Sequence, residues 1–121
     1  MNLTSPYAEL TMTQEVFHSK EPLHLESGEI LSNFDLAYTT YGQLNAERNN
    51  VVWVIHALTG DSNASEWWNG LIGEDKFFDP ADHFIICEKL LGSCYGSTNT
   101  LSENPITCKP YFYDFPQVTT R

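Results

Sequence analysis

The sequence has few basic residues and no long apolar run, and each shortage excludes a class of protein. Its 6 Lys and Arg stand against 16 Asp and Glu, giving a formal net charge of -10. Such a field repels nucleic acid and anionic membrane surfaces, so we expect neither as a partner. No apolar run approaches the roughly 20 residues of a membrane helix. The amino terminus also lacks the segments of a signal peptide, so we expect a cytoplasmic protein.

Cysteine is scarce as well, which argues against a disulfide framework. Cys87, Cys94 and Cys108 are odd in number and show no Cys-x-x-Cys spacing, so we expect reduced thiols. The 4 histidines have no partners at metal-ligand spacing, and we expect no metal. No Gly-x-Gly-x-x-G or phosphate loop follows a strand, so a nucleotide site has no support.

Two continuous apolar runs dominate what is present in these 121 residues, a length that suits one domain or part of one. "VVWVI" (51–55) and "FIICE" (84–88) show no alternation. They predict strands covered on both faces, as in the centre of a mostly parallel sheet. Between them, "SEWWNGLIG" (65–73) has apolar residues at helical spacing and predicts a short helix. Strand, helix and strand make a βαβ unit with a right-handed crossover.

The remaining chain is less regular. "FDLAYTTYG" (34–42) alternates and predicts a half-exposed strand ending at Gly42. "LESGEIL" (25–31) indicates a turn, or a strand broken at Gly28, and residues 1–24 are interpreted as an amino-terminal arm. Residues 90–116 are rich in Gly, Ser, Asn and Pro; loops of that length usually serve a site or belong to something larger.

Ser62 and Cys94 are the obvious candidate nucleophiles, and the residues around them argue against both. Ser62 does not come directly off the strand and lacks the second glycine of a Gly-x-Ser-x-Gly elbow. A helix N-cap from Asp61, Ser62 or Ser65 is the favoured interpretation. Cys94, in "GSCYG", has no histidine after it to activate it. At the strand end, a hydrogen-bonded structural role for His56 is favoured over that of a general base.

The loop after Ile55 carries the remaining chemistry. In open α/β sheets, ligands bind outside the carboxyl ends of the strands. A short loop of small residues there directs backbone N–H groups at the ligand, and these can stabilise a developing oxyanion. An ordinary connection between strand and helix fits the same residues, so both interpretations stay open on physical grounds.

Several sequence segments, in the same order along the chain, resemble one protein family. "NNVVWVIHALTGDSNASEWWNGLIG", "FIICEKLLGSCYGST", "ENPITCKPY" and "DFPQVTTR" are similar to the amino-terminal part of homoserine O-acetyltransferases, from about Phe17 to the last residue. The resemblance implies an α/β-hydrolase fold in which antiparallel first strands lead into a mostly parallel sheet. It also implies acyl transfer from acetyl-CoA, a co-substrate rather than a bound cofactor, to the hydroxyl of L-homoserine in methionine biosynthesis. The full-length form is expected to be a homodimer.

The resemblance also implies where the chemistry lies. The acetyl group would pass through an elbow serine assisted by His and Asp, all later than these residues, so the triad is not in this chain. The backbone N–H of Leu58, in "HALTG", would supply half of the oxyanion hole. Ser93 and Asn99-Thr100 depart from the usual family pattern, which leaves the acyl donor, acetyl or succinyl, and the acceptor open.

Residues 25–121 are accordingly interpreted as the first part of an α/β-hydrolase domain, truncated before the nucleophile elbow. By analogy, strand 51–55 should pair with the later strand that carries the nucleophile, and without it should present an exposed apolar edge. Residues 1–121 alone are expected to be inactive and marginally stable or aggregated. Two alternatives stay open: an ester hydrolase of the same fold, and a non-catalytic remnant that serves as a binding module.

Overall fold

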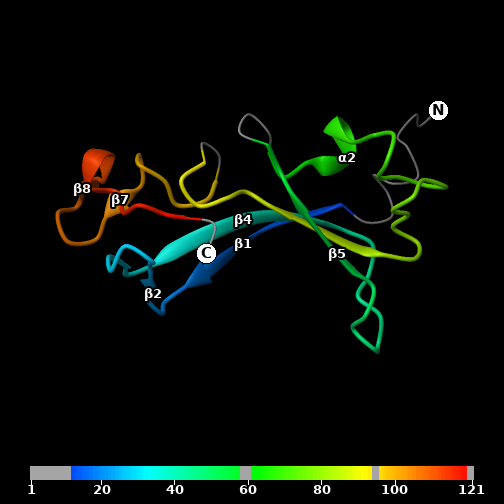
Figure 1. Ribbon diagram of the computed structural model, residues 1–121, viewed down its shortest axis with the longest axis horizontal. Coiled ribbons are helices and arrows are strands. Elements are labelled where there is room, and N and C mark those ends of the chain that lie inside the picture. The colour runs from blue at the N-terminus through cyan, green and yellow to red at the C-terminus, as the bar shows by residue number, and fades with distance from the viewer. Residues whose placement is uncertain (1–11, 58–60, 94–95, 120–121) are drawn as a thin grey trace. The chain divides into compact units, whose positions relative to one another are not determined.

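The computed structural model of the protein describes residues 12–57, 61–93 and 96–119 (Figure 1). The chain divides into two compact units. One comprises Met1–Glu15 and Tyr38–Glu88, and the other comprises Val16–Ala37 and Lys89–Arg121. None of the helices in the described ranges has the length and apolar character needed to cross a membrane.

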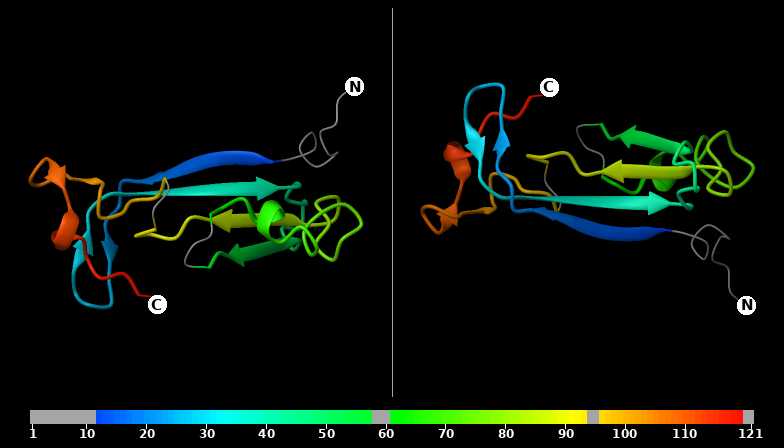
Figure 2. Two further views of the ribbon diagram at one scale, coloured as in Figure 1. Left: turned by 90° about the horizontal axis from the view of Figure 1, so that it is seen from above. Right: turned by 90° about the horizontal axis from the view of Figure 1, so that it is seen from below.

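A four-stranded sheet organises the chain, and Figure 2 shows its strands side by side. Strand β6 pairs antiparallel with β4 and parallel with β5, so that Ile55 lies opposite Glu88. The sheet therefore changes from antiparallel to parallel pairing at β6, as the resemblance implied. The strand order is β1 (Thr13–Ser19), β4 (Phe34–Tyr41), β6 (Phe84–Glu88) and β5 (Val51–Ile55).

Strands β4, β5 and β6 confirm the three strand predictions. Gly42 follows β4 with a φ of 82°, and a Cβ there would lie 2.2 Å from the His83 carbonyl oxygen, so only glycine fits the turn. Helix α2 (Ala64–Trp67) is a single turn, shorter than the predicted 65–73. Asn69 and Gly70 follow the C-cap residue Trp68, and both are weak helix formers, which explains the early end.

The short strands occupy the less regular segments. Strand β1 lies inside segment 1–24, where no strand was predicted, because its residues are almost all exposed and carry no burial pattern. Strands β2 (Leu23–His24) and β3 (Ile30–Leu31) pair antiparallel around Gly28, which has a φ of 89°. In its described part, the long loop contains three short elements, β7 (Glu103–Asn104), β8 (Lys109–Pro110) and the 3-10 turn η1 (Phe112–Asp114).

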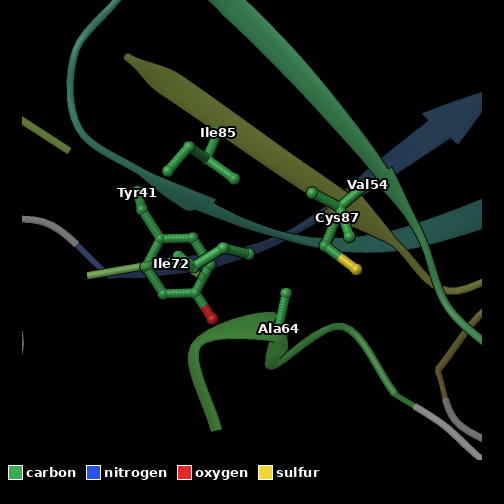
Figure 3. Packing of buried hydrophobic residues seen from close by; sticks show 6 residues of the cluster. All are labelled: Tyr41, Val54, Ala64, Ile72, Ile85 and Cys87. Carbon is green, nitrogen blue, oxygen red and sulfur yellow. The ribbon is translucent and has the colours of Figure 1, made fainter. Parts of the chain in front are cut away.

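The hydrophobic core of the first unit lies between α2 and one face of strands β4, β5 and β6 (Figure 3). On β5 that face carries Val54, which is 3% exposed. The other face of β5 is bare: Val51, Trp53 and Ile55 are 45%, 61% and 59% exposed. The prediction that both faces of 51–55 are covered is therefore wrong for these residues, because no described segment buries that side. The core cluster consists of Tyr41, Val54, Ala64, Ile72, Ile85 and Cys87.

Candidate active-site loop at the end of strand β5

The loop begins with a buried histidine. His56 follows the last residue of β5 and is 6% exposed. Its Nδ1 lies 2.6 Å from the carbonyl oxygen of Ala57. A carbonyl can only accept a hydrogen bond, so Nδ1 carries the proton and donates it. His56 is thus a hydrogen-bonded histidine, as the sequence favoured, and Ala57 beside it is exposed.

The far end of the loop is held by a buried pair of hydroxyls. Ser62 is 3% exposed, and its Oγ lies 2.7 Å from Oγ1 of Thr39 on β4. A serine nucleophile must face its substrate and a general base, whereas this hydroxyl is buried against a neutral partner. The geometry therefore supports a structural role for Ser62.

Asp61 adds further contacts at the same end. Its carbonyl oxygen accepts a hydrogen bond from Trp67 Nε1 at 3.2 Å and one from Cys87 Sγ at 3.8 Å. Trp67 belongs to α2 and Cys87 to β6, so the exit of the loop is tied to both layers of the unit.

The helix cap differs from the prediction. The N-cap of α2 is Asn63, and it makes no side-chain capping bond. Asp61 instead accepts a hydrogen bond from the Asn63 N–H at 2.8 Å, which forms a local turn just before the helix. Asp61, Ser62 and Ser65 are therefore not the cap, because the carboxylate and the Ser62 hydroxyl already hold the loop.

The carboxyl end of β6 brings two titratable groups beside the loop. Burial raises the pKa of the Cys87 thiol from 9.0 to about 11, and the nearby carboxylates of Asp61 and Glu88 add to the rise. A thiol held protonated in this way cannot act as a nucleophile at neutral pH. Burial also raises the pKa of Glu88, while the neighbouring His56 lowers it.

The predicted oxyanion donor, the N–H of Leu58, lies outside the described residues, and so does Cys94. The structure describes the two ends of the loop, and it brings together contacts that sequence reasoning did not identify. Thr39 and Ser62 are 23 residues apart and on different elements, so no local pattern could pair them. Within the described ranges, no three His, Cys, Asp or Glu side chains gather where they could hold a metal ion.

Two similar curated proteins are both named homoserine O-acetyltransferase. A homoserine O-acetyltransferase from Cyclobacterium marinum is 63% identical over 121 residues, which is 100% of this chain and 34% of that protein. One from Chlorobaculum tepidum is 49% identical over 109 residues, covering 90% of this chain and 31% of that protein. The chain thus spans about a third of the length of these relatives. No protein-family profile matches it.

Solved structures agree on the fold. Homoserine O-acetyltransferase from Bacillus anthracis superposes with a TM-score of 0.82 at 33% identity, covering 90% of this chain and 33% of that one. An acetylester hydrolase from Corynebacterium glutamicum superposes with a TM-score of 0.71 at 26% identity. That match covers 88% of this chain and 29% of the hydrolase chain. The predicted resemblance and the α/β-hydrolase fold are both confirmed for the amino-terminal part of such proteins.

Proposed function

We infer that this chain corresponds to the amino-terminal third of a homoserine O-acetyltransferase, because it matches that third of the Cyclobacterium marinum relative along its whole length. The complete enzyme transfers an acetyl group from acetyl-CoA to the hydroxyl of L-homoserine, a step of methionine biosynthesis. The single observation that carries the proposal is the 63% identity over all 121 residues with the Cyclobacterium marinum protein.

The reaction proceeds in two acyl transfers. A serine on a later elbow, with His and Asp beside it, attacks the thioester carbonyl; the new C–O bond forms, the C–S bond breaks, and CoA leaves as the thiol. The homoserine hydroxyl then attacks the acetyl-serine ester, which releases the serine and gives O-acetyl-L-homoserine. Negative charge develops on the carbonyl oxygen in both steps, so fixed N–H donors lower both barriers.

This chain contributes one of those donors, the backbone N–H of Leu58. The supporting features are the position of the loop at the carboxyl end of β5 and the contacts of His56 and Ser62, which hold its two ends. Ligands of open α/β sheets bind at that end of the strands. The second donor is the residue after the nucleophile, on later chain.

The remaining assignments follow from the same proposal. The partners are small molecules, homoserine and acetyl-CoA, and acetyl-CoA acts as a co-substrate. We place the enzyme in the cytoplasm, where its thiols stay reduced, and the complete form is a homodimer.

The reading frame after Arg121 gives the first test. We expect it to continue in frame and to encode a Gly-x-Ser-x-Gly motif. The protein it encodes should form O-acetyl-L-homoserine from acetyl-CoA and homoserine, followed by CoA release and by mass spectrometry of the product. Purified 1–121 should show no transfer above the buffer rate. Transfer by the 121 residues alone would contradict the proposal.

A chimera tests the contribution of this chain directly. Residues 1–121 would replace the matching third of the Cyclobacterium marinum relative, with the unmodified relative as control. Transfer at a rate similar to the control is expected, because 63% of the replaced residues are identical. A folded chimera without activity would favour the alternative of a non-catalytic remnant.

An ester hydrolase is the second candidate, and the fold match to the acetylester hydrolase from Corynebacterium glutamicum favours it. The same oxyanion loop would then serve water as the acceptor. Turnover of an acetyl ester by the complete protein, with and without homoserine, separates the two. Acceleration by homoserine with formation of its ester indicates the transferase, and an unchanged rate with release of acetate indicates the hydrolase.

A further inference from the structure

We propose that the turn after helix α2 is a site of covalent self-modification, in which the side-chain amide of Asn69 is converted to a carboxylate. The attacking group is the backbone nitrogen of Gly70, and the other reactant is water. This inference goes beyond the proposed function and does not depend on it, because both residues lie outside the candidate active-site loop.

The sequence provides the reacting pair. Of the asparagines in the chain, only Asn69 is followed by glycine. A backbone nitrogen can reach the side-chain carbonyl carbon of the preceding asparagine and close a small ring. A side chain on the second residue obstructs that closure and restricts the backbone, whereas glycine does neither. The pair therefore predicts ring closure wherever the fold leaves both groups free.

The structure leaves both groups free. Asn69 and Gly70 are exposed, and they lie in the turn that follows Trp68, the C-cap of α2. Among the described residues, neither the Asn69 side chain nor the Gly70 N–H has a hydrogen-bond partner. A Cβ at Gly70 would meet nothing within 4 Å, so no neighbouring atom limits the movement that brings the nitrogen to the carbonyl carbon.

Asn63, at the other end of the same helix, shows what a protected amide looks like. Its Oδ1 accepts a hydrogen bond from the Tyr41 hydroxyl at 2.7 Å, and its Nδ2 donates one to Glu66 at 3.1 Å. These bonds must break before its side-chain carbon can turn to the next nitrogen. That nitrogen belongs to Ala64, whose side chain also opposes closure. Asn63 is therefore the internal reference for Asn69.

The conversion takes two steps. In the first, the Gly70 nitrogen attacks Cγ of Asn69; the N–Cγ bond forms, the Cγ–Nδ2 bond breaks, and the proton of the N–H leaves with the amide nitrogen as ammonia. In the second, water opens the cyclic imide and the ring nitrogen regains a proton. Attack of water at Cγ gives aspartate. Attack at the main-chain carbonyl gives isoaspartate, in which the backbone runs through the side chain.

Isoaspartate alters a turn that positions a core residue. The carbonyl oxygen of Trp68 accepts hydrogen bonds from the N–H groups of Leu71 and Ile72, both at 2.9 Å. Ile72 is 2% exposed and belongs to the core cluster. An extra backbone carbon between Trp68 and Leu71 lengthens the segment that these bonds close. The isoaspartate form should therefore be less stable, whereas the aspartate form only gains a negative charge.

The test follows the folded chimera, which need not be active, during incubation at mildly alkaline pH. Peptide mapping by mass spectrometry measures the acid formed at Asn69 and at Asn63, and a carboxyl methyltransferase specific for isoaspartate labels that product. Gly70→Ala is the matched variant, because a Cβ fits there and the φ lies outside the left-handed region. If Gly70→Ala does not fold, Asn69→Gln replaces it, since its longer side chain disfavours the ring. If the chimera does not fold, the complete protein takes its place.

We expect acid at Asn69 while Asn63 stays an amide. The rate in the folded chimera should lie within about tenfold of the rate in the urea-unfolded chimera, a factor that corresponds to about 1.4 kcal/mol in the barrier. Gly70→Ala should slow the conversion about fivefold or more, because the added Cβ restricts the backbone. The isoaspartate form should unfold at a lower urea concentration than the unmodified protein.

Folding that slows the conversion by more than about tenfold would overturn the inference, since the turn would then protect the amide. Equal rates in the parent and Gly70→Ala would overturn it too. Unfolding of the isoaspartate form at an unchanged urea concentration would contradict the consequence for the core. A chimera that converts Asn69 but transfers no acetyl group would count against the proposed function alone, so the two failures are distinguishable.

Discussion

The two faces of strand β5 differ sharply, although the strand is a continuous apolar run. On the face toward α2, Val54 and Cys87 are 3% and 0% exposed (Figure 3). On the opposite face, Trp53 is 61% exposed and Ile55 59%. The alternation of a strand places these sets on opposite sides, so one side is a core and the other is an apolar surface.

This difference shows what a continuous apolar run can and cannot predict. A continuous run such as "VVWVI" predicts a strand, but it does not say which residues, if any in this chain, cover each face. The described residues cover one side. A contiguous exposed apolar face and an edge strand usually mark an interaction site or an aggregation hazard. Within the proposed function, later chain covers this face and pairs with β5.

The largest expected effect comes from removing Trp53, which is exposed here and which, within the proposed function, later chain covers. Trp53→Ala in the chimera should lower the free energy of unfolding by about 3–5 kcal/mol, the usual cost of truncating a buried Trp. Val54→Ala, on the same strand and the other face, is the matched reference. Urea unfolding of both variants and the parent measures the costs.

A cost below about 0.5 kcal/mol for Trp53→Ala, typical of surface substitutions, would contradict the covering of this face. Val54→Ala should remain destabilising in either case, because Val54 already belongs to the core cluster of this chain. The pair therefore separates a bare β5 face from a chimera that is poorly folded throughout.

Local sequence patterns predicted the parallel strand pair and missed the features set by tertiary contacts. Strands 51–55 and 84–88 have the predicted bounds because each is a run of β-branched and other apolar residues, which favour an extended strand. β1 was missed because an exposed strand needs no pattern. The length of the helix 65–73 was overestimated because apolar residues at helical spacing do not require a helix throughout. Trp67 packs against the core from the helix, whereas Ile72 reaches the core from the turn that follows it.

In the candidate site, too, features of local sequence could be predicted and features set by tertiary contacts could not. The loop of small residues after Ile55 predicts an oxyanion site there, which stays a prediction. The hydrogen bond of His56 was expected from its place at the strand end, and the structure has it. The partner of Ser62 could not be predicted, because Thr39 reaches it only through the strand order of the sheet. The helix cap was wrong for a related reason: Asp61 and Ser62 were already engaged by the loop.

Burial of the α2-facing side of the sheet should also make the free energy of unfolding depend on pH in the alkaline range. Because burial raises the pKa of Cys87 to about 11, the folded state favours the protonated thiol. The associated stability is complete below the unfolded value of 9.0 and is lost as the pH rises toward about 11. The parent chimera should lose about 2 kcal/mol over this interval from Cys87 alone.

Cys87→Ala separates this loss from the titration of other groups, because it lacks the thiol. Its unfolding free energy, measured by denaturant titration at several pH values, should fall less steeply than that of the parent between pH 9 and 11. Parallel curves for the two proteins would show that Cys87 is not protected from ionisation, and that the core on the α2 side is open to water.

The smallest effect concerns Glu88, next to Cys87 on β6 but facing the bare side with Ile55. Burial raises its pKa above the ordinary 4.5, so the folded state favours the neutral acid and stability falls as the pH rises through the raised value. Glu88→Gln should therefore be more stable than the parent at neutral pH, with the gain vanishing below pH 4. Denaturant unfolding at both pH values measures this gain in the free energy of unfolding, with the exposed Glu103→Gln as control.

A gain in unfolding free energy at neutral pH that is larger in the chimera than in 1–121 would show that later chain buries this face. A loss of unfolding free energy in Glu88→Gln would show that a partner stabilises the carboxylate there.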